Sequence, residues 1–110
     1  MRASTQSLIE DWRRHLAQDR RRSVHTVRAY IATAERLVAF LQEHQGASVT
    51  RNALTTLAAA DIRSFLAERR STDDIGNLST ARELSAIRGF LRFVGGEGGS
   101  IPTLKGPRVK

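Results

Sequence analysis

The sequence predicts an all-α protein that folds as a single domain of four helices. The length of 110 residues suits one hydrophobic core. Hydrophobic residues make up 40% of the chain, which is enough to fill a core in a domain of this size. Four segments repeat apolar residues at three- and four-residue steps, and no segment alternates apolar and polar residues as a strand does.

The first predicted helix runs from Thr5 to Asp19. Its apolar residues fall on one stripe: Leu8, Ile9, Trp12 and Leu16. Three consecutive arginines, Arg20 to Arg22, follow it and lead to Ser23. The helix is therefore expected to bury one face and to end in a basic connection.

The second predicted helix begins after Ser23, whose hydroxyl can accept a hydrogen bond from a free backbone N–H of the first turn. Gly46 ends the helix, because glycine is the residue best suited to the left-handed conformation found there. Its apolar stripe is the longest in the chain: Val27, Tyr30, Ile31, Ala34, Leu37, Val38 and Leu41. The mixed, polar residues 47–56 are expected to form a loop.

The third predicted helix is shorter and covers Ala58 to Arg70. Its inward residues are Ile62, Phe65 and Leu66. Asp61 lies in the first turn, where the helix dipole favours a negative charge. Residues 71–78 follow as a loop, because Ser, Thr, Asp, Gly and Asn are turn-forming residues.

The fourth predicted helix opens at Ser79 or Thr80, where Thr80 and Glu83 have the spacing of a capping box. Its buried stripe consists of Leu84, Ile87, Leu91 and Val94, widened by Phe90 and Phe93. A glycine-rich run that starts at Gly95 ends this helix. The domain is therefore expected to cover residues 1–94. Residues 95–110, with two prolines and three basic residues near their end, are expected to begin a linker.

The charge of the chain favours a polyanionic partner. Lys and Arg number 18 against 11 Asp and Glu, which gives a net charge of +7, and 16 of the 18 basic residues are arginine. Arginine binds phosphates and base edges through two parallel hydrogen bonds. Nucleic acid is the simplest such partner. The alternative is that the arginines are ordinary solvent-exposed surface residues of a protein from a GC-rich genome.

Several other classes of function have no support in the sequence. There is no cysteine for a disulfide, a thiol nucleophile or a Cys-based zinc site. The histidines (His15, His25 and His44) lack the spacing of metal ligands, and no glycine-rich loop precedes a helix, so no metal and no cofactor are expected. Tyr30 falls on an apolar stripe and is expected to be a core ring rather than a nucleophile. No apolar run reaches membrane-spanning length and no signal peptide is apparent, so we expect a cytoplasmic protein.

The polar faces of the second and fourth helices are the candidate contact surfaces. Helix N-termini bind phosphates. The major groove of DNA admits one α-helix, and arginine is the side chain that most often reads the bases there. The candidates from the start of the second helix are Arg20, Arg21, Arg22, Ser23, His25, Thr26 and Arg28. Those from the fourth helix are Arg82, Ser85, Arg88 and Arg92, and small residues such as Gly89 between them would permit a close approach. The alternative is that these are the ordinary polar faces of amphipathic helices.

The order of these segments resembles the tyrosine recombinases. Residues 23–41 resemble the S-x-N-T-x-x-x-Y…L-x-x-F-x-x-F/L run of that family, with His25 where Asn is usual. Residues 78–93 resemble its R-x-L-S-A-I/L-R-x-F-x-R-F helix, with Leu91 where an aromatic residue is frequent. Residues 61–66 match its short intervening helix. The chain is most similar to the XerC/XerD branch, with XerC favoured.

The resemblance implies a SAM-like orthogonal four-helix bundle that forms half of a C-shaped clamp on DNA. It implies that helices two and four meet the major groove of a double-stranded recombination site. A XerD-like partner recombinase in a heterotetramer and a DNA translocase are implied as partners, with resolution of chromosome dimers at the nucleoid as the process. None of the catalytic residues of that family can be carried over onto this sequence, so this chain is expected to bind DNA without cutting it.

Two alternatives to that interpretation stay open. The first is the same type of domain from a phage, transposon or integron integrase. The second is a helical interaction module that does not bind DNA.

Overall fold

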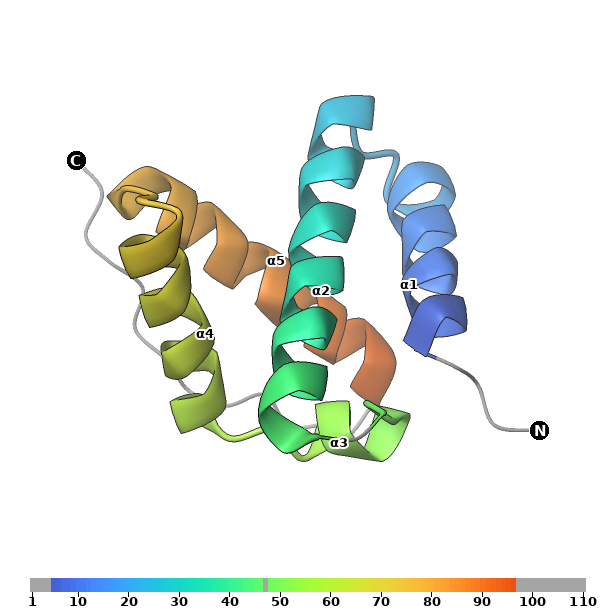
Figure 1. Cartoon of the computed structure of the whole chain (residues 1–110). Helices are drawn as coiled ribbons and strands as arrows, with labels where there is room; N and C mark the ends of the chain where they lie inside the picture. The colour runs from blue at the N-terminus through green and yellow to red at the C-terminus, as the bar shows by residue number, and fades with distance from the viewer. Residues whose placement is uncertain (1–4, 47, 97–110) are drawn as a thin grey trace.

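The computed structural model describes residues 5–46 and 48–96, and this part of the chain consists of helices and connections without strands (Figure 1). The helices are α1 (Thr5–Arg14), which continues as one π-helical turn η1 (His15–Asp19), α2 (Val24–Gln45), α3 (Arg51–Thr55), α4 (Ala59–Thr72) and α5 (Asn77–Gly95). The predicted all-α class is confirmed. The four predicted helices are present, and α3 is an additional short one.

The helices surround one core that lies where α5 crosses α2. In Figure 1, α2 stands in the centre between α1 and α4, and α5 passes behind it. α2 packs on α1 as well as α5, and α3 and α4 pack against α5. Trp12, at 1% exposure, lies with its ring centroid 5.1 Å from Phe90 and 5.9 Å from Tyr30. These rings join three helices into a single hydrophobic unit.

The predicted ends of α2 and the start of α4 are confirmed in detail. Ser23 Oγ accepts a hydrogen bond from the backbone N–H of Thr26 at 3.1 Å. Gly46 closes α2 with φ of 65°, a left-handed conformation that favours glycine. Asp61 lies in the first turn of α4, and its Oδ2 accepts from the N–H of Ala58 at 3.1 Å. Local sequence rules therefore predict these three termini correctly.

The predicted start of the fourth helix is wrong. α5 begins at Asn77, with Gly76 as its N-cap, so Thr80 lies inside the helix and its hydroxyl donates to the carbonyl of Gly76 at 2.8 Å. Glu83 does not reach back to form a capping box, because its carboxylate binds Arg69 of α4. A buried ion pair between helices takes this side chain away from its local partner.

Residues 47–56, predicted as a loop, contain α3. Thr50 caps this helix by accepting from the N–H of Ala53 at 3.1 Å, and Leu54 is 1% exposed. Arg51 donates from Nε and Nη2 to the carbonyl of Val94, at 3.1 and 2.8 Å. These hydrogen bonds connect α3 to the C-terminal end of α5, which ends at Gly95. Most of the predicted linker, residues 97–110, lies outside the described residues.

Candidate nucleic-acid interface

Two grooves lie side by side at the crossing of α2 and α5. We name them after the element that bounds each: the η1 groove, of about 390 Å³, and the α4 groove, of about 720 Å³. Tyr30 lines both of them. The N-terminal half of α2 is therefore flanked on both sides by concave surface.

The structure brings predicted contact residues from separate helices together in each groove. The η1 groove is lined by Arg20 and Arg22, which precede α2, and by Ser85 and Arg92 of α5. More than 60 positions of sequence separate the first pair of residues from the second. The crossing of the helices brings the two pairs into one groove.

The α4 groove contains His25 and Thr26 of α2 and Arg82 of α5. The remaining predicted residues line neither groove: Arg21, Ser23, Arg28 and Arg88. The Ser23 hydroxyl serves as the α2 cap, and Arg28 is exposed on α2. Gly89, predicted to permit close approach to DNA, lines the η1 groove and lies over Trp12: a Cβ built on it would meet Cζ2 of that ring at 3.4 Å.

The arginines divide by what their guanidinium contacts. One group is held by the protein, as where Arg69 binds Glu83, Arg70 donates to Thr80 and Arg51 donates to Val94. A second group has no side-chain hydrogen bond or ion pair to any residue in the described part of the chain: Arg20, Arg21, Arg22, Arg28, Arg63, Arg82 and Arg92. All of this second group except Arg63 of α4 are predicted contact residues.

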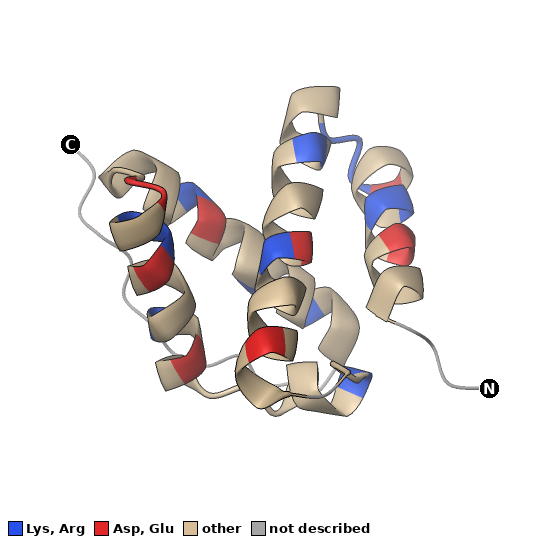
Figure 2. Cartoon of the chain, in the orientation of Figure 1, with Lys and Arg blue, Asp and Glu red and all other residues tan. Residues whose placement is uncertain are grey.

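The placement of positive charge at the start of α2 opposes the helix dipole. Figure 2 shows basic residues along the connection from η1 to α2 and on the first turns of α2. The N-terminus of a helix carries partial positive charge, so cations there are unfavourable by a few tenths of a kcal/mol or more each. A bound anion removes this cost. The arrangement thus fits phosphate binding better than it fits the stability of the free domain.

A buried ion cluster borders the α4 groove, and the sequence pattern does not indicate it. Glu83, whose side chain is 7% exposed, accepts from Arg69 Nε at 2.9 Å and from Nη2 at 3.2 Å. Arg69 also contacts Asp73 at 2.8 Å. The hydrogen bond to Glu83 raises the pKa of Arg69 above its ordinary value, against the opposing effect of burial. Arg36 Nη2 lies 3.8 Å from the same carboxylate.

Among residues 5–46 and 48–96, no three side chains that can hold a metal ion are close enough to do so. No helix in that part of the chain has the length and apolar character to cross a membrane. Tyr30 is half-buried and stacked on Trp12, as predicted for a core ring. What the grooves offer is cationic and hydroxyl side chains for a phosphate-bearing ligand.

Comparison with known proteins gives a consistent family. The model described as "Phage integrase, N-terminal SAM-like domain" matches residues 9–98. Tyrosine recombinase XerC of Nitrobacter winogradskyi is 39% identical over 105 residues, which cover 92% of this chain and 32% of that protein. Tyrosine recombinase XerC of Bradyrhizobium diazoefficiens is 37% identical over 102 residues, covering 89% of this chain and 32% of that protein.

A third relative, tyrosine recombinase XerC of Rickettsia conorii, is 36% identical over 91 residues, covering 83% of this chain and 30% of that protein. The chain therefore spans about a third of the length of the curated relatives it matches. No solved structure matches it significantly.

Proposed function

Because this chain belongs to the family of phage integrase N-terminal SAM-like domains, we propose that it binds duplex DNA through the two grooves beside the α2–α5 crossing. The observation that carries the proposal is the distribution of arginines without a protein partner in the described part of the chain. Six of these lie in or near the two grooves or on α2, and Arg63 is the exception. Such arginines are free to bind phosphates or base edges.

The two ends of this surface are suited to different contacts. Arg20 and Arg22 precede the N-terminus of α2, which is a place for phosphate binding that orients the protein on the duplex. Arg82, Ser85 and Arg92 come from one side of α5. A single helix fits the major groove, and arginine reads guanine there through two hydrogen bonds. In this proposal α2 positions the domain and α5 reads sequence.

The XerC relatives support a proposal for the wider role. In this proposal the chain is the DNA-clamping domain of a XerC-like site-specific tyrosine recombinase, and the DNA is a recombination half-site. Its partner in a heterotetramer is a XerD-like recombinase, and a DNA translocase is a further partner. The complex resolves chromosome dimers in the cytoplasm. Strand cleavage belongs to a separate catalytic domain.

The test is a fluorescence anisotropy titration of the 110-residue chain with a labelled duplex at low salt. Arg82→Gln combined with Arg92→Gln is expected to weaken binding at least tenfold, because two charge-assisted contacts are lost. Arg63→Gln is the matched control: it removes a partnerless arginine from α4, away from both grooves. Equal losses of binding free energy for each charge removed would show that net charge, rather than this surface, binds DNA.

A further inference from the structure

Arg36 lies on the side of α2 that faces the α4 groove. The residues that α2 contributes to this groove recur at helical steps over three turns: His25, Thr26, Ala29, Tyr30, Ala32, Thr33 and Arg36. Most of those between the two ends are small. The stripe extends about 16 Å from His25 to Arg36, at the usual rise of an α-helix. A cationic side chain therefore lies at one end of a stripe of mostly small residues that line the α4 groove.

The contacts of Arg36 inside the protein are weak. Its Nη2 donates to Thr33 Oγ1 at 3.3 Å and lies 3.8 Å from Glu83 Oε1, beyond hydrogen-bond distance. Its Nε is buried and has no hydrogen-bond partner among the described residues. The side chain as a whole is 40% exposed. Protein contacts thus leave this guanidinium incompletely bonded at the border of an open groove.

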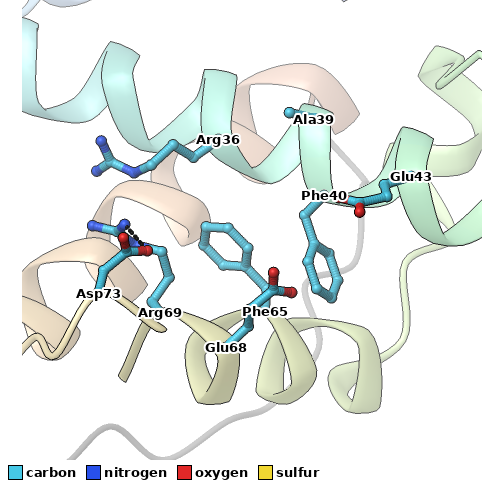
Figure 3. Close-up of a pocket in the computed structure, with 8 residues that line it drawn as sticks. All are labelled: Arg36, Ala39, Phe40, Glu43, Phe65, Glu68, Arg69 and Asp73. Carbon is cyan, nitrogen blue, oxygen red and sulfur yellow. Dashed lines mark hydrogen bonds and ion pairs between the residues drawn. The ribbon is translucent and has the colours of Figure 1, made fainter. Parts of the chain in front are cut away.

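The neighbouring carboxylate is already occupied. Arg69 binds both oxygens of Glu83 and also contacts Asp73 at 2.8 Å, so both nearby carboxylates already have Arg69 as their partner. Figure 3 shows the guanidiniums of Arg36 and Arg69 at the same end of a pocket between α2 and α4, with Glu43 at the other end. Arg36 therefore has only the 3.8 Å contact with Glu83 as an ion pair, and a phosphate that approaches its guanidinium gains a charge-assisted hydrogen bond.

We propose that Arg36 contacts a backbone phosphate of DNA lying in the α4 groove, together with Arg82 on the opposite wall, and that Glu83 is the positioning residue that holds Arg69 in place beneath them. This inference rests on the proposed DNA binding and adds a residue on α2, well beyond its N-terminus. The phosphate supplies an acceptor for the exposed part of the Arg36 side chain, whereas Nε stays buried. Because a phosphate carries no sequence information, the contact strengthens binding to cognate and random duplexes alike.

The experiment measures the affinity of the 110-residue chain for a cognate and a random duplex as salt is varied. Each phosphate contact contributes about 0.9 to the slope of log affinity against log salt. Arg36→Gln is expected to lower that slope by about 0.9 and to weaken binding about eightfold at 0.1 M salt on both duplexes. Arg36→Lys keeps the charge and is expected to keep the slope. Arg63→Gln, the matched control on α4, is expected to leave slope and affinity near those of the wild type.

The outcomes separate this inference from the proposed function. Failure of the wild type to bind any duplex overturns the proposed function itself. Binding by the wild type with an unchanged slope in Arg36→Gln overturns the inference alone. If Arg36→Gln does not fold, the NMR signal of the Arg36 Nε–H in the wild type decides. A shift on adding duplex, absent on adding sodium chloride, supports the contact, and no shift excludes it.

Discussion

Arginine residues serve either the fold or the surface of this molecule, and the two groups respond to different measurements. Arg51, Arg69 and Arg70 donate to groups on other helices or turns, so their loss reduces stability. Arg20 and Arg82 have no such acceptor in the described residues, so their loss is expected to leave stability nearly unchanged. Thermal unfolding and DNA binding together therefore separate the two roles.

Substitutions in the two helix surfaces are expected to differ in their dependence on DNA sequence. Arg20→Ala, Arg21→Ala or Arg22→Ala is expected to weaken binding equally on cognate and random duplexes, as for phosphate contacts. Arg82→Ala or Arg88→Ala is expected to cost a further 1–3 kcal/mol or so on the cognate duplex, if either side chain pairs with guanine. Binding isotherms on both duplexes provide the measurement. Equal losses of affinity on the two duplexes across all five variants would show that α5 does not read bases.

Tyr30 is expected to have no catalytic role. Its ring stacks on Trp12 with centroids 5.9 Å apart, and its hydroxyl has no hydrogen-bond partner in the described part of the chain. Tyr30→Phe should therefore change the free energy of unfolding by less than the ~0.5–1.5 kcal/mol of one hydrogen bond. The chain should form no covalent adduct with a nicked half-site in denaturing electrophoresis. An adduct that disappears in Tyr30→Phe would contradict this.

At the scale of the helices, the N-terminus of α2 connects stability with the candidate interface. Ser23 caps the helix, and the same turn carries Arg22 and His25 into the two grooves. Ser23→Ala is expected to lower the free energy of unfolding by about 1 kcal/mol. Ser64→Ala, an exposed position inside α4, is the control and should be neutral or slightly stabilising. Urea denaturation measures both; equal effects would show that the cap contributes nothing.

The ion pair between α4 and α5 is expected to be a strong determinant of stability. Glu83→Ala leaves the largely buried Arg69 with only the exposed Asp73 as a counter-ion, so it should cost up to roughly 3 kcal/mol in unfolding free energy. The double variant Glu83→Leu, Arg69→Met removes both charges and should recover much of that loss. Because the hydrogen bond to Glu83 raises the pKa of Arg69 above its ordinary value, the stability gained from this charge is present at neutral pH and is lost only at strongly alkaline pH.

At the scale of the whole molecule, the net charge of +7 governs how DNA affinity responds to salt. Contact with about six phosphates would reduce affinity about a thousandfold between 50 and 200 mM salt, through release of counterions. Dissociation constants of roughly 10⁻⁴–10⁻⁶ M are expected at physiological salt, because that is the range for non-specific binding. Anisotropy titrations over this range test the expectation. Affinity independent of salt would contradict an electrostatic interface.

The helices that local sequence rules predict are those with long apolar stripes or clear caps. α2 has both, and its Ser23 and Gly46 ends follow from hydrogen bonding and backbone conformation within a few residues. α3 is too short for its periodicity to stand out, and Thr50 is its only local signal. The start of α5 was misplaced because Glu83 fits a local cap in sequence but pairs with a distant arginine in space.

The sequence by itself determined the all-α class, the inward faces of the long helices and the set of basic residues on α2 and α5. These depend on periodicity, capping and charge, which act between near neighbours in the chain. Only the tertiary structure decided that Arg22 and Arg92 share one groove, that His25 and Arg82 share another, and that Arg36 and Arg69 face one carboxylate. The reason is physical: the crossing of α2 over α5 is set by packing around Trp12 and Phe90, and no local pattern encodes which distant side chains that packing brings together.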